Sequence, residues 1–172
     1  VIPGCYLIFA AHAYRALADR NTARTLAAQW FALGLLLFLL GPGLLGALQA
    51  LPDVSRYTVG TRLSDLQTTL TLLAVLAVSL GIANQAAAEL RGQSTRVTGY
   101  IPFWLVAFGV VLAALALGAA GVTQTMLERR LSLGYLDTQT LLMPLYALWF
   151  GGLALAALGV LVYALTFWRR RP

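Results

Sequence analysis

The chain has 172 residues, of which 60% are hydrophobic and only 10% are charged. Soluble domains average about 45–50% apolar and about 25% charged residues, so this composition excludes an ordinary soluble domain and predicts a membrane protein. The net charge of +6 comes from arginines alone. They lie between apolar segments and at the C-terminus, where membrane topology requires them, so no nucleic-acid partner is expected. Cys5 is the only cysteine, which excludes an intrachain disulfide and a cysteine cluster for metal ligation.

Five segments are candidates for membrane-spanning helices, each of which needs about 20 mostly apolar residues. They predict an all-α fold: a polytopic membrane helix bundle of five transmembrane helices, in a single domain over residues 1–172. The sequence starts at Val1 inside an apolar run, so we expect this domain to be the C-terminal part of a longer protein. The segments, of which the first is the shortest, are Ile2–Leu17, Leu26–Leu51, Leu63–Ala88, Ile101–Leu127 and Leu141–Trp168.

Two features predict how these segments bend and pack. Pro42, between Gly41 and Gly43, removes a backbone donor and clashes with the preceding turn, so the second segment should bend there. In the fifth segment three small residues recur at helical spacing, which predicts a close approach to a neighbouring helix. They are Gly152, Ala156 and Gly159.

The arginines predict the orientation of the bundle. Eight of the twelve fall on one side of the membrane, and the positive-inside rule assigns that side to the cytoplasm. We therefore expect an inner-membrane protein with a cytoplasmic C-terminus and with the polar turn Asp53–Arg62 outside. The eight are Arg15, Arg20, Arg24, Arg91, Arg96, Arg169, Arg170 and Arg171. Aromatic residues expected at the interfaces are Tyr57, Tyr100, Trp104, Tyr135 and Trp168.

The stretch around the polar turn carries the most specific motif of the chain. Gly41-x-Gly43-x-x-Gly46 is followed by Leu51-Pro52, by Tyr57-x-x-Gly60-Thr61 and then by an apolar helix. This order resembles subunit I of the haem–copper oxidase superfamily, in particular the cytochrome-c-dependent nitric oxide reductases and the cbb-type oxidases. The resemblance implies that the five helices correspond to the last five of a twelve-helix core.

In that family the helix after Gly-Thr carries two histidines, one residue apart, which hold the two haems. Counted from Gly60-Thr61, these positions fall on Gln67 and Thr69, and neither is a histidine. Haem iron is normally held by His, Met, Cys or Tyr, so an amide or a hydroxyl is a poor substitute. The resemblance therefore predicts the fold, while the two substitutions predict that this helix binds no haem.

Three functions remain open. We favour a haem-free structural or assembly component of a respiratory complex, without cofactor, that contacts the lipid bilayer and either other membrane subunits or the missing N-terminal helices. The first alternative is the C-terminal part of a catalytic nitric oxide reductase or oxidase subunit that binds haem b through ligands supplied elsewhere. The second is an unrelated transporter or membrane scaffold. Only the catalytic alternative would make the chain an enzyme.

The start of the third helix is unusually polar, which allows two interpretations. A functional one is the remnant of a site or a polar cavity within the bundle. A structural one, which we favour, is a helix cap: Ser64-x-x-Gln67 has the spacing of a capping box, and Asp65 suits the positive end of the helix dipole. The threonine hydroxyls can bond back to their own helix. The polar residues are Ser64, Asp65, Gln67, Thr68, Thr69 and Thr71.

The remaining ionisable candidates also have plain interpretations. His12, the only histidine, is expected to pack neutral near the cytoplasmic end, because one histidine cannot build a metal site alone. The resemblance implies that paired arginines between the last two helices contact haem propionates. For Arg129-Arg130 we favour instead a solvated pair with Glu128 as partner. Asp53 and Arg56 are expected to pair with each other.

Overall fold

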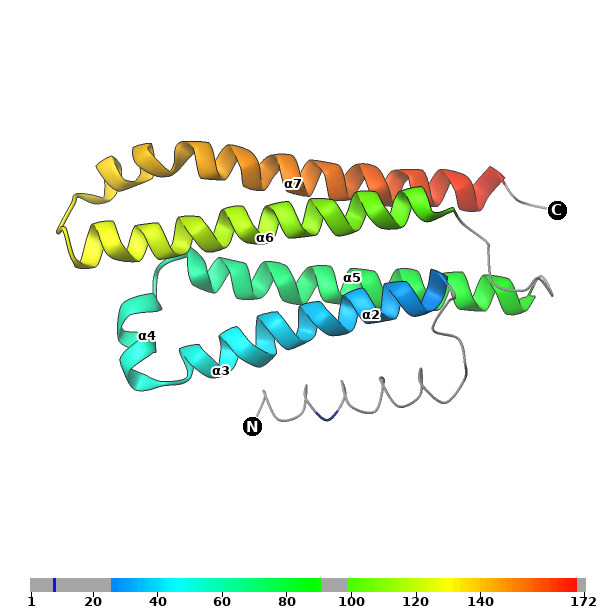
Figure 1. Cartoon of the computed structure of the whole chain (residues 1–172), viewed down its shortest axis with the longest axis horizontal. Coiled ribbons are helices and arrows are strands. Elements are labelled where there is room, and N and C mark those ends of the chain that lie inside the picture. Colours follow the sequence, from blue (N-terminus) through cyan, green and yellow to red (C-terminus); the bar gives the residue numbers. More distant parts are fainter. Residues whose placement is uncertain (1–7, 9–25, 91–98, 170–172) are drawn as a thin grey trace.

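The computed structural model describes residue 8, residues 26–90 and residues 99–169, and the elements in these ranges are all helices (Figure 1). The all-α prediction is thus confirmed for the described chain. The elements are α2 (Leu26–Phe38), the π-helix η1 (Leu39–Leu45), α3 (Gly46–Gln49), α4 (Pro52–Thr58), α5 (Arg62–Leu90), α6 (Tyr100–Arg129) and α7 (Tyr135–Arg169).

Four helical stretches have the length and composition of membrane spans: Leu26–Gln49, Arg62–Ala87, Tyr100–Arg129 and Tyr135–Thr166. They contain 24 to 32 residues, which is enough to cross a hydrocarbon core of about 30 Å. These four agree with the last four predicted segments and are compatible with an integral membrane protein. The first predicted segment, Ile2–Leu17, lies outside the described residues except for Ile8, so the count of five stays a prediction.

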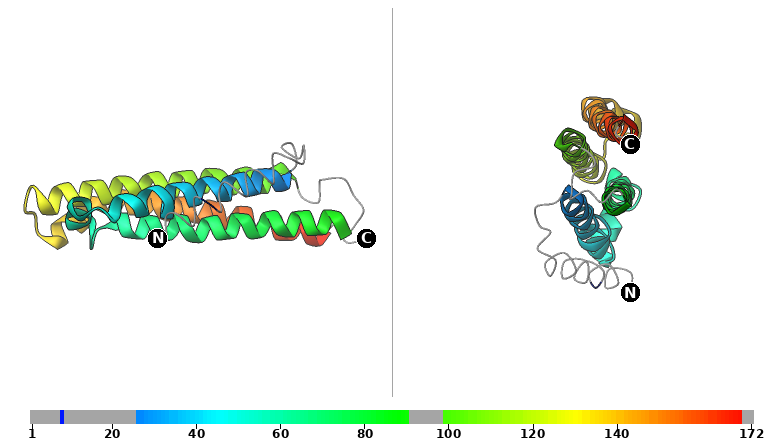
Figure 2. Two further views of the ribbon diagram at one scale, coloured as in Figure 1. Left: turned by 90° about the horizontal axis from the view of Figure 1, so that it is seen from below. Right: turned by 90° about the vertical axis from the view of Figure 1, so that its right-hand side faces the viewer.

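The four long helices form a zigzag row. α2 packs on α5, α5 on α6, and α6 on α7, as the view along the helices shows (Figure 2). The arrangement is more open than a compact bundle, so the helices leave much apolar surface uncovered. In α7 only 17% of an 18-residue apolar stretch is buried. This surface is suited to lipid or to further membrane helices.

The contact between α6 and α7 depends on glycines. A Cβ on Gly152 of α7 would stand 2.6 Å from the backbone nitrogen of Ala113 and 2.7 Å from the carbonyl oxygen of Gly109, both in α6. A Cβ on Gly159 would stand 2.9 Å from the nitrogen of Val106. The two backbones therefore touch, and Ala156 is buried between these glycines. The predicted close approach of the fifth segment to a neighbour is confirmed.

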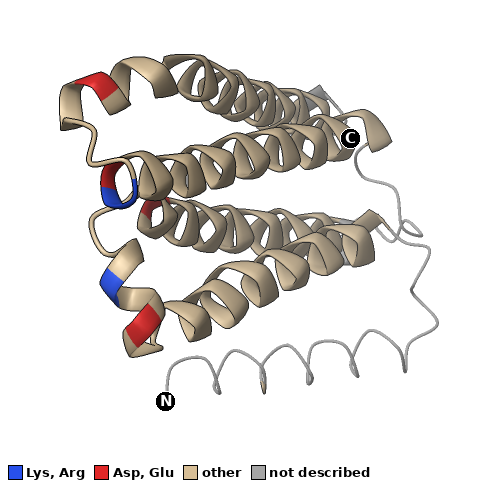
Figure 3. Ribbon diagram, turned by 60° about the vertical axis from the view of Figure 1, so that its left-hand side comes forward, with Lys and Arg blue, Asp and Glu red and all other residues tan. Residues whose placement is uncertain are grey.

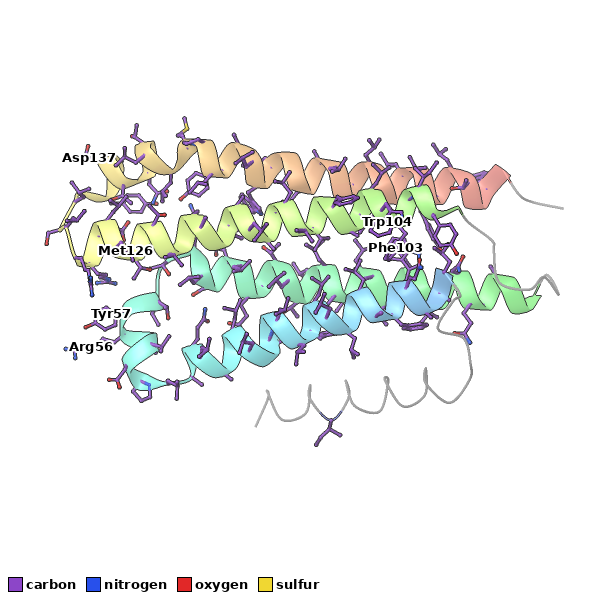
Figure 4. The ribbon with its side chains drawn as sticks, in the orientation of Figure 1. Arg56, Tyr57, Phe103, Trp104, Met126 and Asp137 are labelled. Atoms are coloured by element: carbon purple, nitrogen blue, oxygen red, sulfur yellow. The ribbon has the colours of Figure 1, made fainter. Side chains whose placement is uncertain are left out.

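The core at the end of the helices opposite α4 is aromatic (Figure 4). Trp30 of α2 is fully buried, and its ring makes edge contacts with Phe103 of α6 at 5.2 Å and with Tyr163 of α7 at 5.9 Å between centroids. The Tyr163 hydroxyl donates to the carbonyl oxygen of Leu80 in α5 at 3.0 Å. One tryptophan and one tyrosine thus join all four long helices.

Pro42 lies where the regular α-helix of the second segment is interrupted. The helix continues through residues 39–45 as the π-helix η1, with Pro42 inside it, and then resumes as α3. A π-turn accommodates the missing donor by widening the turn, so the chain stays helical. Gly41 faces α5, where a Cβ would stand 2.8 Å from the Cβ of Leu70. The bend stays a prediction, and the π form was not predicted.

The predicted polar turn is itself partly helical, which corrects our interpretation. α4 occupies Pro52–Thr58, with Pro52 at its start and Asp53 in its first turn. Proline is favoured at the first helical position and acids suit the helix N-terminus, so these residues begin a helix rather than mark a loop. Gly60 then adopts φ +81°, a conformation that favours glycine, and allows the chain to enter α5.

The last link is also shorter than predicted. α7 begins at Tyr135, six residues before the predicted start at Leu141, and only residues 130–134 separate it from α6. The first turns of α7 are polar, so apolar periodicity does not reveal them. Asp137 suits the N-terminal end of this helix, and the Thr140 hydroxyl bonds back to the Leu136 carbonyl at 3.0 Å.

Candidate functional site

Charged residues gather at the end of the row that holds α4 and the α6–α7 connection (Figure 3). We call this the α4 end. The starts of α5 and α7 and the end of α6 meet here, and the apolar spans all lie on one side of it. A membrane protein places such an end at the bilayer surface.

At the α4 end, α5 and α7 are joined by a polar cluster of Arg62, Asp65, Tyr146 and Gln139. Arg62 Nη1 donates to Asp65 Oδ2 at 2.7 Å, and Arg62 Nε donates to the Tyr146 hydroxyl at 3.2 Å. The Tyr146 hydroxyl donates in turn to Gln139 Oε1 at 2.7 Å. The guanidinium carbon also lies 5.2 Å from the centre of the Tyr146 ring, a favourable cation–π distance.

Gln124 of α6 connects to the start of α5. Its Oε1 accepts the backbone N–H of Arg62 at 3.0 Å, and its Nε2 donates to Glu128 Oε1 at 3.0 Å. The side chain is 3% exposed, so both ends of a buried amide are satisfied. A residue 62 positions away thereby supplies the partner that the first turn of a helix lacks in its own backbone.

This bond corrects the predicted capping box. α5 begins at Arg62, so Ser64 lies inside the helix and cannot be its N-cap. The residue before the helix is Thr61, whose hydroxyl donates backwards to the Thr58 carbonyl at 2.7 Å. The role assigned to Ser64 is therefore taken by Gln124. The predicted back-bonding of threonines is confirmed, since Thr68 and Thr71 donate to carbonyls four residues earlier.

A pocket of about 230 Å³ opens beside the polar cluster. Most of its lining residues are polar, and they come from α5, α6 and α7 and from the turn before α5. The side-chain amide nitrogen of Gln139 is buried there without a hydrogen-bond partner in the described chain. The lining residues are Gly60, Thr61, Arg62, Ser64, Asp65, Gln124, Tyr135 and Gln139.

The two positions at which the resemblance would place haem ligands do not suit that role. Gln67 and Thr69 are both half-buried on α5, and neither side chain is a usual haem ligand. The amide nitrogen of Gln67 lies 3.0 Å from the point where a Cβ on Gly46 would stand. Gln67 therefore packs against the start of α3, and the polar cluster lies elsewhere on α5.

Two predicted ion pairs are wrong. In the described part of the chain the one ion pair is Arg62–Asp65, so Asp53 and Arg56 do not pair with each other. Arg56 is exposed on α4, and Figure 4 shows it beside Tyr57 at the edge of the molecule. Glu128 accepts from Gln124 rather than pairing with the arginines that follow it, because its side chain turns back along α6. Those two, Arg129 and Arg130, are exposed.

The structure gives no site to the other candidates. His12 lies outside the described residues, as do seven of the eight arginines that are expected on the cytoplasmic side; the eighth is Arg169. Within residues 26–90 and 99–169, His, Cys, Asp and Glu do not gather into a group of three or more that could hold a metal ion.

Sequence reasoning missed the partners of Arg62. Gln124 and Tyr146 stand inside segments predicted from apolar content, where a single polar residue draws little attention. An isolated Gln in an apolar helix is the signal that could have found the first, since a polar group inside a membrane needs a partner. The phenol of Tyr146 gave no such signal.

Searches with this sequence against protein-family models and against curated proteins found no match. The likeness to the haem–copper oxidases therefore depends on the residues quoted for it.

Proposed function

We propose that the chain is a haem-free structural or assembly component of a respiratory membrane complex. The observation that carries this proposal is the packing of Gln67 against Gly46 at a family ligand position. An iron ligand must present its donor atom to an open space beside the helix. Here the amide is placed against a neighbouring helix instead, in a contact that stabilises the fold.

The open row of helices supports a structural role. α6 and α7 are joined by direct backbone contact, while large apolar side chains on their other faces are exposed. One stripe of α6 carries large apolar side chains that are 61–70% exposed, namely Ile101, Phe108 and Leu115. A rigid helix pair with uncovered apolar faces is suited to contacts with lipid and with other membrane subunits.

Deletion and complementation in the source cell would test the proposal. Membranes that lack the chain should lose oxygen or nitric oxide reduction, and the wild-type chain should restore it. Gln67→Ala and Thr69→Ala should restore it equally, and the purified chain should show no Soret absorption. Unchanged reduction without the chain would favour the membrane scaffold instead. One haem per chain, lost in either variant, would favour the catalytic alternative.

Thiol labelling would test the proposed inner-membrane orientation. In a Cys5→Ser background, Ser55→Cys on α4 should react with an impermeant maleimide added to intact cells. Arg170→Cys should react only after the membrane is permeabilised. These expectations rest on the eight-to-four arginine distribution. The reverse labelling pattern would overturn the orientation and leave the fold unaffected.

A further inference from the structure

The pocket at the α4 end is lined by one positive and one negative side chain that each have a polar atom without a bond within the described chain. Arg62 and Asp65 both line it, and their side chains are 37% and 49% exposed. Their bonds within the protein use Nε and Nη1 of Arg62 and Oδ2 of Asp65. Nη2 of the guanidinium and Oδ1 of the carboxylate are therefore available to a ligand that carries both signs of charge.

A third group points to an acceptor on that ligand. The Gln139 amide nitrogen is buried and has no hydrogen-bond partner in the described chain, although its oxygen accepts from Tyr146. A buried donor without an acceptor is unfavourable, and a bound water, ion or ligand is one explanation for it. Gln139 and Arg62 line the same pocket from different helices, so an oxyanion there can accept from Arg62 directly and from Gln139 once its amide nitrogen turns into the pocket.

The position of the pocket indicates which kind of molecule surrounds it. The pocket lies where the apolar spans of α5, α6 and α7 end, which is the depth of the lipid head groups. Tyr135 on its rim and the adjoining Leu136 are 61% and 78% exposed. An aromatic and an aliphatic side chain beside a polar pocket match a molecule with a polar head and an acyl tail.

We propose that this pocket binds the zwitterionic head group of a phospholipid, of the phosphoethanolamine type. The phosphate accepts from Arg62 and from Gln139, and the ammonium donates to Asp65. Arginine suits a phosphate because its planar donors meet two oxygens at once. The volume of about 230 Å³ equals that of roughly eight waters at ~30 Å³ each, which is room for such a head group.

The charges of the pocket also predict selectivity. A head group with a phosphate but no ammonium leaves the Asp65 carboxylate without a cationic partner, so the two negative charges in the pocket are not compensated. A choline head group keeps the positive charge but has no N–H to donate to the carboxylate. We therefore expect phosphatidylethanolamine to bind more tightly than phosphatidylcholine, and phosphatidylglycerol to bind most weakly. Loss of one charge-assisted hydrogen bond corresponds to roughly tenfold in affinity.

Native mass spectrometry of the whole chain in detergent, titrated with each of the three lipids, would test this. Wild type should retain phosphatidylethanolamine about tenfold more tightly than phosphatidylglycerol. Asp65→Asn should remove that preference, and Gln139→Ala should weaken binding of all three lipids. Soluble phosphoethanolamine should compete poorly, because it lacks the acyl chains. Equal competition by it would show that a free solute, rather than a lipid, is the ligand.

The chain offers matched controls on α4. Arg56→Gln and Asp53→Asn change one exposed arginine and one exposed acid that lie outside the pocket and make no ion pair within the described part of the chain. Both should bind phosphatidylethanolamine like wild type, whereas Arg62→Gln should not. Because Arg62 also joins α5 to α7, lipid binding by Arg62→Gln is compared with wild type only if the two have the same unfolding midpoint. If they differ, the test depends on Asp65→Asn alone. Equal retention by wild type and Asp65→Asn would show adventitious lipid only and overturn the proposal.

Discussion

The α6–α7 contact and the polar cluster at the α4 end hold helices together by different means. In the first, backbone touches backbone at Gly109 and Gly152, and no side chain can be added. In the second, Arg62 and Tyr146 reach across from α5 to α7 through long side chains. Close packing tolerates no change in distance, whereas a hydrogen-bonded side chain can follow a moving helix. We expect stability to depend on the first region and ligand response on the second.

The largest effect is expected from Gly152→Leu. Its Cβ alone would stand 2.6 Å from a backbone atom of α6, so the two helices must separate. Overpacking typically costs about 1–3 kcal/mol, and a clash with backbone belongs at or above the upper value. Gly151→Leu is the matched control, because nothing lies within 4 Å of a Cβ there. The free energy of unfolding in SDS mixed micelles, followed by circular dichroism, would measure both.

If Gly151→Leu is as destabilising as Gly152→Leu, the loss reflects leucine in a membrane helix rather than the contact with α6. The α6–α7 contact would then not be the region on which the stability of the protein depends.

Gln124→Leu is expected to come next. It removes the acceptor of the Arg62 backbone N–H and the donor to Glu128, at a cost of about 1–2 kcal/mol in the free energy of unfolding. Thr125→Val on the same helix turn is the control, since its hydroxyl only bonds back to the Gly121 carbonyl. Hydrogen exchange at the first amides of α5 should rise in Gln124→Leu alone. Unchanged exchange would show that Gln124 does not cap α5.

A smaller effect is expected from Tyr146→Phe. It removes one bond to Arg62 and one to Gln139 while it keeps the ring, and bonds between membrane helices average about 0.6 kcal/mol each. The total should be about 1 kcal/mol. Tyr57→Phe, at an exposed phenol, should change nothing. A double-mutant cycle with Arg62→Gln should give a coupling energy of a few tenths of a kcal/mol; additive losses would show that the two side chains act independently.

The smallest effect is expected from Gln67→Ala. The half-buried amide packs on Gly46, so its removal should cost no more than about 0.6 kcal/mol. The unfolding midpoint should move less than in Tyr146→Phe. A loss as large as that of Gln124→Leu would show that Gln67 holds more of the structure than its contact with α3 indicates.

The long spans could be predicted from sequence because apolar length alone identifies a membrane helix. The small-residue pattern of Gly152, Ala156 and Gly159 likewise predicted the α6–α7 contact, since close approach needs no knowledge of the partner. By contrast, α4 and the first turns of α7 were assigned to links. Their polar residues follow helix-start signals, such as Pro52 and Asp53, that a search for apolar runs passes over.

The candidate site could be predicted only in part. The polar start of the third segment pointed to the right helix, and Asp65 to the right end of it. The partners of Arg62 on α6 and α7, Gln124 and Tyr146, lie 62 and 84 positions away from it, and no local pattern relates them. The alternative of a polar cavity within the bundle, which we ranked second, is closer to the observed pocket than the capping box is.

The π-helix η1 also fixes which way the chain faces as it leaves the second span. A π-turn closes one residue later than an α-turn, so the helix beyond it is rotated by about one residue, or roughly 100°. Deleting Pro42, which has no backbone N–H, would restore regular α-helical bonding and yet turn α3 by that angle. Gly46 would then leave Gln67, and α4 would point to a different part of the membrane surface. The length of this segment is therefore as constrained as its composition, even though most of its residues are leucine and glycine.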